Sequence, residues 1–362
     1  MSAEPPQNRP LCVAVGMSGG TDSSAAAALL LEQGHQVVGL TAHLWQDGSR
    51  CCSLEDARRA ERVCKKLGVP HHLVDARGFF SERIVSPFVR AYAEGRTPSP
   101  CVVCNQVIKF GLLLREAMTL GCTHLATGHY ARLVRRDDGL HLLRGADTAK
   151  DQSYFLHRLS TAQLEHVLFP LGEKTKADAH HVLQRLHLPV PPSGESQDLC
   201  FVTDDGYAAF LEKRRPELRQ PGPIVNRQGR LLGRHAGLHR YTIGQREGLG
   251  IASDTRMYVK ELRAESNTLV VGQLAEVLSD HCRLDDVHWI HGAPEASITC
   301  SVRLRYRHAG APAVVTPRTG PQATVKFNEP QFAVTPGQAA VFYLEDEVLG
   351  GGWIAAPAKE DG

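Results

Sequence analysis

The sequence predicts an α/β protein with three parts: a parallel-sheet domain with a helical extension, a small central mixed, β-rich domain, and a C-terminal antiparallel β-barrel. Three observations predict this architecture. Apolar strands alternate with helices in the first half of the chain, a glycine-rich turn joins the first strand to the first helix, and short strands separated by Pro and Gly fill the second half. We expect the three domains to cover residues 1–205, 206–285 and 286–362.

The alternation begins with the apolar run Leu11–Val15, a predicted buried strand, and Ser24–Gln33, a predicted helix closed by Gly34. Further strands are predicted over residues 36–40, 71–74 and 124–128, and further helices over residues 54–68, 81–94 and 107–120. Such alternation is typical of a parallel sheet, whose ligands gather at the carboxyl ends of the strands. We therefore expect a ligand crevice at that edge.

The second half begins after a helical pattern over residues 160–188, for which Ser160 and Thr175 are the expected N-caps. Prolines at 189, 191 and 192 end this pattern. Short strands are then predicted over residues 257–262, 268–271, 298–303, 324–327 and 339–344. Their spacing, with Pro and Gly between them, favours small antiparallel barrels or sandwiches.

The composition is that of an ordinary globular protein, because 42% of its 362 residues are hydrophobic and 22% are charged. Its 41 Lys and Arg residues against 39 Asp and Glu residues leave a net charge of +2, so a nucleic-acid surface would have to come from local clusters. Candidate clusters are Lys213–Arg215 with Arg219, and Arg303–Arg307 with His308. A solvated charged face is the equally weighted alternative for each.

No apolar run is long enough to span a membrane, and residues 1–10 lack the pattern of a secretion signal. We therefore expect a cytoplasmic protein with no membrane partner. Its ten cysteines show no regular disulfide-like spacing, which favours reduced thiols, some of them with a chemical role.

The glycine-rich turn is the most informative segment, and we take all of it as an ATP-binding candidate: Gly16, Met17, Ser18, Gly19, Gly20, Thr21, Asp22 and Ser23. Backbone N–H groups of such a turn, the positive end of the following helix and the two serine hydroxyls can hold an anion. The turn lacks the patterns of both a Walker loop and a dinucleotide-binding loop. An ordinary strand-to-helix turn is the weaker alternative, because this stretch also supplies an acid and two serines.

The Ser-Gly-Gly-x-Asp-Ser pattern resembles the pyrophosphate loop of the N-type ATP pyrophosphatases, the PP-loop superfamily. That resemblance implies cleavage of ATP into AMP and pyrophosphate, with Asp22 holding Mg²⁺ through the pyrophosphate. Leu40, Ala42 and Gly128 lie at or just after the carboxyl ends of predicted strands, where they can share one crevice with the loop, and we expect them to line the adenine pocket.

Three cysteines stand in two predicted loops, Cys101 and Cys104 in a C-x-x-C pair behind two prolines, and Cys200 far downstream. A structural zinc site is one alternative, but it normally needs a second C-x-x-C pair. Thioredoxin-like exchange is another, but we expect no helix to start at this pair, and exchange alone would leave the phosphate loop unexplained.

Taken together, the motifs resemble those of the tRNA-specific 2-thiouridylases over nearly the whole chain. The motifs are Gly16–Ser23, Thr97–Asn105, Ala126–Tyr130, Lys150–Tyr154, Glu195–Phe201, Tyr241–Arg246, Arg303–Arg307 and Pro336–Gln338. The resemblance implies ATP-dependent sulfur insertion at C2 of the wobble uridine, by adenylation of the C2 oxygen and then transfer of sulfur from a cysteine persulfide. It implies that Cys200 carries the persulfide received from a sulfur donor, a cysteine desulfurase or a relay protein. Cys104 would release the sulfur or close a disulfide with Cys200.

The chain departs from the family at Cys101, where many relatives have Asp, and at Ala42, where relatives often have Met. Cys101, Cys104 and Cys200 would suit an iron–sulfur cluster with one open iron, so a cluster-assisted reaction stays open beside the persulfide relay. We interpret the remaining seven cysteines as packing or incidental thiols: Cys12, Cys51, Cys52, Cys64, Cys122, Cys282 and Cys300.

By the same resemblance, several segments of the chain would contact the anticodon loop of tRNA. Ser99, Pro100 and Cys101 would line the target base. The other expected contacts are His129, Lys150, Asp151, Gln152, Arg305, Tyr306 and Gln338. Two other classes of function remain as alternatives: a PP-loop amide or amidine ligase, which needs no converging cysteines, and a nucleic-acid or metal-cluster binding protein without turnover.

Overall fold

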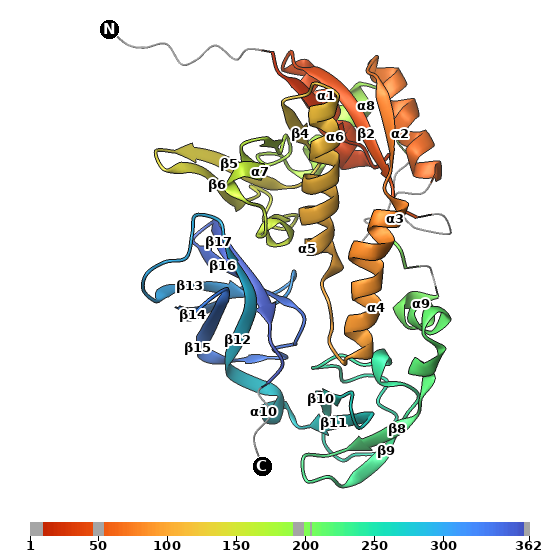
Figure 1. Cartoon of the computed structure of the whole chain (residues 1–362), viewed down its shortest axis with the longest axis vertical. Coiled ribbons are helices and arrows are strands. Elements are labelled where there is room, and N and C mark those ends of the chain that lie inside the picture. Colours follow the sequence, from red (N-terminus) through yellow and green to blue (C-terminus); the bar gives the residue numbers. More distant parts are fainter. Residues whose placement is uncertain (1–9, 46–53, 191–198, 203–204, 358–362) are drawn as a thin grey trace. The chain divides into compact units, whose positions relative to one another are not determined.

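The computed structural model describes residues 10–45, 54–190, 199–202 and 205–357 (Figure 1). The chain divides into two compact units, the first formed by residues 1–81 with 103–201 and the second by residues 82–102 with 202–362. Among the described residues, no helix combines the length and the apolar character needed to cross a membrane.

A five-stranded parallel sheet forms the centre of the first unit, with the strand order β3-β2-β1-β4-β7. The strands are β1 (Cys12–Gly16), β2 (Gln36–His43), β3 (His71–Asp75), β4 (His124–Ala126) and β7 (Val167–Leu168). This confirms the predicted parallel sheet, to which the structure adds β7, a strand that the sequence did not predict. Strands β2 and β3 are added on one side of β1, and β4 and β7 on the other. The carboxyl ends of β1 and β4 therefore flank the position where ligands of such sheets bind.

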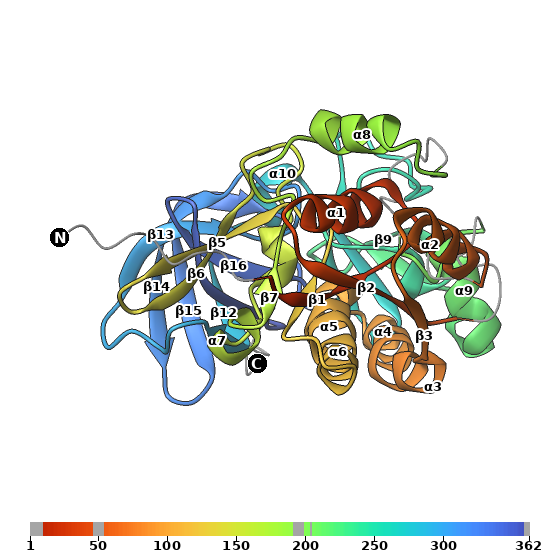
Figure 2. The ribbon, with the colours of Figure 1, turned by 90° about the horizontal axis from the view of Figure 1, so that it is seen from above.

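Helices cover both faces of this sheet (Figure 2). The helices α1 (Thr21–Glu32), α2 (Leu54–Leu67) and α8 (Lys176–Arg185) pack on one face, and α6 (Leu114–Thr119) lies on the other. Val13 and Val15 point from β1 into the alanine-rich side of α1, because alternate residues of a strand face opposite sides. The predicted N-caps are confirmed: the side chains of Ser160 and Thr175 form capping boxes at α7 (Thr161–Leu164) and α8.

The first two thiols lie in a helix, and the prediction that placed them in a loop is wrong. The helix begins with α5 (Pro100–Cys104), widens into a π-helix over Asn105–Leu113 and continues as α6. Pro100 starts it because the fixed φ of proline suits the first helical position, where no hydrogen-bond donor is needed. The second predicted helix of this region, over residues 81–94, is present as a π-helix, Ser81–Val85, and α4 (Ser86–Ala93), and α3 (Arg77–Phe80) precedes it.

A hairpin of β5 (Ala131–Arg136) and β6 (Gly139–Arg144) follows β4 in the first unit and was not predicted. Its alternating residues and the sequence Asp137-Asp138-Gly139 are nevertheless a recognisable hairpin signal. A short 3-10 helix, Ser153–Leu156, comes next along the chain.

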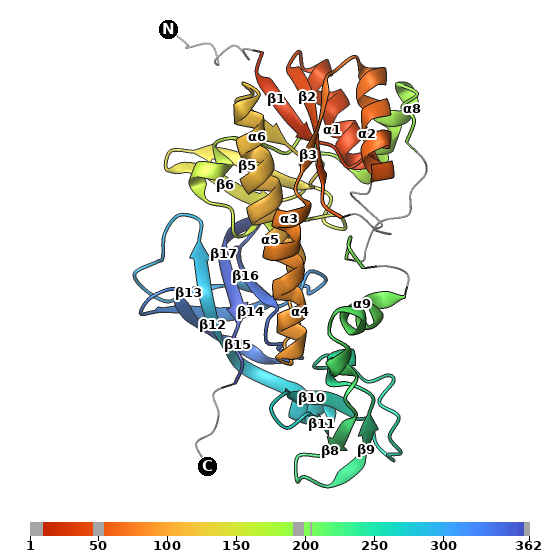
Figure 3. The same ribbon diagram turned by 45° about the vertical axis from the view of Figure 1, so that its right-hand side comes forward.

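The central part of the second unit begins with α9 (Gly206–Arg214) and the 3-10 turn Pro216–Arg219. A four-stranded sheet follows, in the order β10-β11-β8-β9 (Figure 3). Along the chain, the 3-10 turn Leu238–Arg240 comes between β9 and β10. The strands are β8 (Gly222–Val225), β9 (Leu231–His235), β10 (Tyr258–Arg263) and β11 (Thr268–Gly272). The β8–β11 pair is parallel and the other two pairs are antiparallel, as expected for a small mixed domain.

A closed six-stranded antiparallel barrel ends the second unit, after the short helix α10 (Leu274–Val277). Its strands are β12 (Leu278–Trp289), β13 (Ile298–Arg303), β14 (Ala311–Arg318), β15 (Gln322–Phe332), β16 (Ala339–Leu344) and β17 (Glu347–Ile354). The pairing of β12 with both β15 and β17 closes the barrel and confirms the predicted C-terminal fold. Cys282 and Cys300 are buried in the core of the barrel.

Candidate active site

The glycine-rich turn after β1 folds as a loop that is held by hydrogen bonds to β2 and between its two serines. The backbone N–H of Met17 donates to Leu40 O at 2.7 Å, which fixes the start of the loop against β2. The Ser18 N–H donates to Ser23 Oγ at 3.2 Å, and the two serine hydroxyls are 3.1 Å apart. Ser18 is exposed and Ser23 is buried, so Ser18 is the one of the pair that lies at a surface that an anion can reach.

Two glycines allow the close packing of this loop. Gly19 has a φ of +72°, and a Cβ at this residue would lie 2.7 Å from Asp56 O. Gly128 follows β4, and a Cβ there would lie 2.6 Å from the Asp22 carbonyl carbon and 2.7 Å from Ser23 N. The chain after β4 therefore packs directly on the first turn of α1, which requires glycine at that position.

Asp22, in the first turn of α1, is the acidic residue of the loop. Its Oδ1 accepts a hydrogen bond from the Tyr130 hydroxyl at 2.9 Å and an ion pair from Lys176 Nζ at 2.7 Å. Burial and the nearby Asp22 carboxylate raise the pKa of Tyr130, so its hydroxyl stays protonated and donates. Lys176 was not expected in the site, because it approaches from α8, 154 residues further along the chain.

The expected adenine-pocket residue Ala42 lies in β2 and is 7% exposed. Its backbone is paired in register with Val74 of β3. Its neighbour Thr41 donates from Oγ1 to Met17 O at 2.9 Å, which joins β2 to the phosphate loop. A role of Ala42 in adenine binding stays a prediction.

Cys104 ends α5, directly before the π-helix, and is half-buried, whereas Cys101 is exposed. Asn105 is buried and donates from Nδ2 to Phe155 O at 3.3 Å. Gln163 donates from Nε2 to Phe110 O at 2.7 Å, with a longer contact of 3.5 Å to Gln106 O. Gln163 thus satisfies carbonyl groups of the widened turn behind Cys104. Such π-turns occur often at functional sites.

Cys200 is half-buried, and its neighbour Phe201 anchors it to the first unit. The ring of Phe201 packs edge-on against Phe80, with centroids 5.7 Å apart, and Phe80 packs against Trp45 at 6.2 Å. Trp45 follows β2, and Phe80 ends α3, which follows β3. This aromatic series links Cys200 to the carboxyl edge of the sheet, where the phosphate loop lies. The family motif residues 195–198, and also Cys51 and Cys52, lie outside the described residues.

His129, an expected RNA contact, is 7% exposed. Its Nδ1 lies 2.7 Å from Thr127 Oγ1 and its Nε2 lies 3.4 Å from Lys109 Nζ. Burial, and secondarily the Lys109 charge, hold the pKa of His129 well below its usual range, so the ring is neutral at neutral pH. A neutral Nε2 accepts from the Lys109 ammonium, which leaves Nδ1–H to donate to Thr127.

Two further expected RNA contacts brace the chain that follows β6. Asp151 is buried and accepts from the N–H groups of Gly145 and Ser153 at 3.2 and 3.0 Å. Gln152 accepts through Oε1 from Tyr130 N at 3.1 Å. Lys150, between these residues and the turn at Asp147, is half-exposed. Lys150 is therefore the charged residue of the segment 150–152 that is partly exposed, since Asp151 is buried.

Gln338, in the second unit, holds the chain that precedes the cysteine pair. Its Nε2 donates to Thr97 O at 2.9 Å and to Pro98 O at 3.3 Å. Thr97 N donates to Pro336 O at 3.0 Å, and a Cβ on Gly337 would lie 3.0 Å from Thr97 O. Thr242 contacts the same residue, with the two hydroxyls 3.0 Å apart. Two motifs that are distant in the sequence thus converge on the segment leading to Ser99 and Pro100.

Arg305 and Arg307 are exposed on the turn after β13, and Tyr306 is half-buried between them. Arg303 is the brace of this turn, because its guanidinium donates from Nε to His308 O at 2.9 Å and also bonds Tyr306 O. The turn therefore displays two unburied cations of the predicted cluster.

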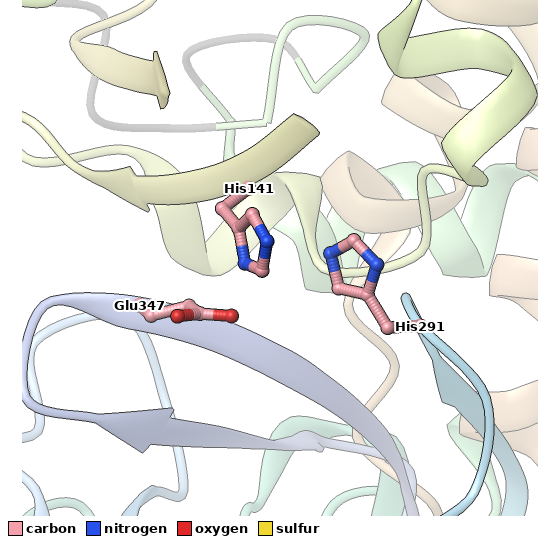
Figure 4. A group of neighbouring side chains, drawn as sticks. All are labelled: His141, His291 and Glu347. Carbon is pink, nitrogen blue, oxygen red and sulfur yellow. The ribbon is translucent and has the colours of Figure 1, made fainter. Parts of the chain in front are cut away.

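Figure 4 shows three side chains of metal-binding types, His141, His291 and Glu347. His141 lies on β6 in the first unit, is buried, and contacts the Asp138 carboxylate through Nε2 at 2.8 Å. His291 and Glu347 belong to the second unit. Because the set draws on both units, it does not make up a metal site within either of them.

Comparison with known proteins identifies the family. Residues 11–204 match the model of the tRNA methyl transferase HUP domain, residues 208–273 that of the tRNA methyl transferase PRC-barrel domain, and residues 279–354 that of the aminomethyltransferase beta-barrel domain. The tRNA-specific 2-thiouridylase MnmA of Geobacter metallireducens is 47% identical over 359 residues, covering 96% of this chain and 98% of the relative.

Two further relatives of the same name extend this likeness. MnmA of Magnetococcus marinus is 47% identical, with 96% of this chain and 99% of the relative covered. MnmA of Chloroflexus aurantiacus is 46% identical, with 95% and 98% covered. Together with the phosphate loop and the two thiol-bearing segments, these matches show that the chain belongs to the family of tRNA-specific 2-thiouridylases.

Proposed function

We propose that this protein replaces the C2 oxygen of the wobble uridine in tRNA with sulfur, at the expense of ATP. One observation carries the proposal: three segments reach the same edge of the parallel sheet. The phosphate loop follows β1, the helix that bears Cys104 contacts the segment after β4 through Lys109 and His129, and the chain at Cys200 packs on the segments after β2 and β3. Nucleotide and sulfur chemistry can therefore use one crevice.

The proposed reaction has two stages. The C2 oxygen attacks the α-phosphorus of ATP and pyrophosphate leaves, so that AMP becomes the leaving group at C2. The terminal sulfur of a persulfide on Cys200 then attacks C2 and displaces AMP. The Cys104 thiolate attacks the Cys200 sulfur, which releases the thiolated base and leaves a Cys104–Cys200 disulfide. A thiol reductant restores both cysteines, and an external persulfide donor reloads Cys200.

For the first stage, we propose that the loop N–H groups, Ser18 and Ser23 hold the phosphates and that Lys176 supplies a positive charge to them. The 2.7 Å ion pair with Asp22 keeps Lys176 at the loop. A bound Mg²⁺ would neutralise charge on the departing pyrophosphate, and Asp22, with its carboxylate at the helix start, is the residue of the loop that would hold it.

For the RNA, we propose that the anticodon loop is contacted by Lys150, Arg305 and Tyr306, with Ser99, Pro100 and Cys101 at the target base. The exposure of Arg305 and Cys101 supports this, and Lys150, Tyr306 and Ser99 are half-buried, whereas Pro100 is buried. The buried or internally bonded residues His129, Asp151, Gln152 and Gln338 would act by bracing these segments. Phosphate contacts by Lys and Arg are the sequence-independent part of such binding.

The test is to incubate the purified protein with tRNA, ATP, Mg²⁺ and a persulfide source and to measure thiolated wobble nucleoside by mass spectrometry. We expect 2-thiouridine formation together with AMP and pyrophosphate. Cys200→Ser should abolish the product while ATP and tRNA binding persist, because only the sulfur carrier is removed. Cys64→Ser, at a buried thiol of the same unit, is the matched control and should retain product formation.

Two outcomes would contradict the proposal. Product formation by Cys200→Ser at the wild-type rate would reject the persulfide role. Loss of activity on removal of a brown, visibly absorbing cluster from anaerobic protein would favour the iron–sulfur route through Cys101, Cys104 and Cys200 instead.

A further inference from the structure

Two cysteines outside the proposed catalytic set lie against each other in the first unit. The sulfur atoms of Cys12 and Cys122 are 3.2 Å apart, although the two residues are 110 positions apart in the sequence. Cys12 begins β1 and is half-buried, and Cys122 lies in the turn between α6 and β4 and is 3% exposed.

The backbone around this thiol pair is fixed on both sides. Thr123 N donates to Cys12 O at 2.9 Å, and its hydroxyl donates to the same oxygen at 3.2 Å. Cys122 N donates to Ala117 O at 3.0 Å, which ties the turn to α6. The pairing of β1 with β4 begins one residue after Cys12 and two residues after Cys122, with Val13 opposite His124.

The position of the two sulfur atoms supports a disulfide, because the hydrogen bonds from Thr123 to Cys12 O hold the two residues beside each other. Because the bond itself is about 2.0 Å long, the sulfurs need to approach by only a small rotation of the two side chains from their 3.2 Å separation.

We propose that Cys12 and Cys122 are a redox-active dithiol that closes to a disulfide by exchange with a small-molecule disulfide. The Cys12 thiolate, from the more exposed side, attacks the reagent RSSR, forms a mixed disulfide and releases RS⁻. The Cys122 thiolate then attacks the Cys12 sulfur and releases the second RS⁻. The two protein thiols are oxidised and RSSR is reduced to two RSH, with the protons passing to the released thiolates.

Cys122 shares a raised pKa with the other buried thiols, and its contact with the Cys12 sulfur is the feature that sets it apart. Burial raises the pKa of Cys64 to about 11 and that of Cys282 and Cys300 to about 12. Burial, with the neighbouring Cys12, also raises the pKa of Cys122 to about 12. Cys122 is therefore a poor first attacker in solution, and its reaction depends on the sulfur held beside it. This makes Cys12 the entry point.

The disulfide would act away from the proposed catalytic edge. Cys12 is at the amino end of β1, and the phosphate loop is at its carboxyl end. Closing the bond would tie β1 to the chain leading into β4, the strand after which Gly128 meets the first turn of α1. We therefore expect oxidation to stabilise the first unit without blocking ATP binding, because a cross-link restricts the unfolded chain.

The experiment treats the reduced full-length protein with glutathione disulfide, blocks the remaining thiols by alkylation and maps disulfide-linked peptides by mass spectrometry. We expect a peptide pair that joins residues 12 and 122, with a mass about 2 Da below that of the two free thiols, and a higher Tm. Cys12→Ser should abolish both the peptide pair and the Tm shift while ATP affinity stays unchanged. Cys64→Ala should retain both.

Three results would overturn the proposal. They are a stable glutathione adduct on Cys12 with Cys122 still free, both thiols remaining reduced while other cysteines oxidise, and a peptide pair that joins Cys12 to a different cysteine. Urea-unfolded protein treated in parallel provides the reference, since loss of the native contact should lower the yield of the 12–122 pair at least tenfold. The result does not depend on thiolation, so it stands or fails separately from the proposed function.

Discussion

The phosphate loop and the residues expected to contact RNA differ in how their polar groups are used. In the loop, neighbouring residues bond one another, as Ser18 does with Ser23, and Ser18 stays exposed. Four of the ten expected RNA contacts are instead engaged inside the protein, as Gln338 is with Thr97 and Asp151 is with Gly145 and Ser153.

This difference shows that the motifs shared with the family are of two kinds. A motif that folds onto itself, such as Gly16–Ser23, carries its own binding geometry. A motif such as Pro336–Gln338 is characteristic because it positions another segment, here Thr97 and Pro98 before the cysteine pair. The comparison predicts that mutations in the loop act on ATP and that mutations in the bracing residues act on thiolation without a direct loss of RNA charge contacts.

The largest effect is expected at the loop itself. Gly19→Ala would place a Cβ 2.7 Å from Asp56 O at a φ of +72°, so the loop has to shift. We expect ATP affinity to fall at least about tenfold, equivalent to about 1.4 kcal/mol, by calorimetry. Gly34→Ala is the control, because Gly34 has a similar φ of +83° and nothing within 4 Å of the added Cβ. It should cost about 1–2 kcal/mol of stability and leave ATP affinity unchanged. Equal ATP affinities of the two variants would show that the contact is unimportant.

An intermediate effect is expected at the π-turn behind Cys104. Gln163→Leu removes the donor to Phe110 O and Gln106 O, so the widened turn loses its support and Cys104 changes direction. We expect the single-turnover rate of thiolation to fall about tenfold, equivalent to about 1.4 kcal/mol of transition-state stabilisation, and the alkylation rate of Cys104 to change, with ATP affinity retained.

Ser160→Ala controls for the second role of Gln163, which completes the capping box of α7. It should cost about 1 kcal/mol of stability and leave both rates as in the wild type. If Ser160→Ala slowed thiolation as much as Gln163→Leu, the effect would belong to the cap and not to the π-turn.

The sequence was sufficient to predict the elements whose signals are local. The parallel sheet follows from alternating apolar strands and helices, and the phosphate loop from contiguous residues between β1 and α1. The N-caps Ser160 and Thr175 were equally predictable, because capping is decided within one turn. The β5–β6 hairpin also carried a local signal, Asp138-Gly139, that was overlooked.

The rest depends on contacts between distant segments. Lys176 reaches Asp22 across 154 positions, and nothing near Lys176 in the sequence marks it as a loop residue. The π-helix after Cys104 needs Gln163 to satisfy its carbonyls, and 3.6-residue periodicity gives no sign of such a widening. The start of the helix at Pro100 was missed because a Pro-rich stretch favours a loop unless the proline occupies the first helical turn.

The smallest effect separates a bracing residue from a contact residue within the second unit. Arg305→Ala removes an exposed charge, so we expect tRNA affinity to fall about fivefold and the slope of log K against log salt to become shallower by about one. Gln338→Ala removes uncharged bonds to Thr97 O and Pro98 O, so the slope should stay as in the wild type while thiolation slows. Filter binding over a salt series measures both slopes. If Gln338→Ala gave a slope as shallow as that of Arg305→Ala, loosening the Thr97 segment would also have moved positively charged side chains of the protein away from the RNA. Bracing and RNA contact would then be one function.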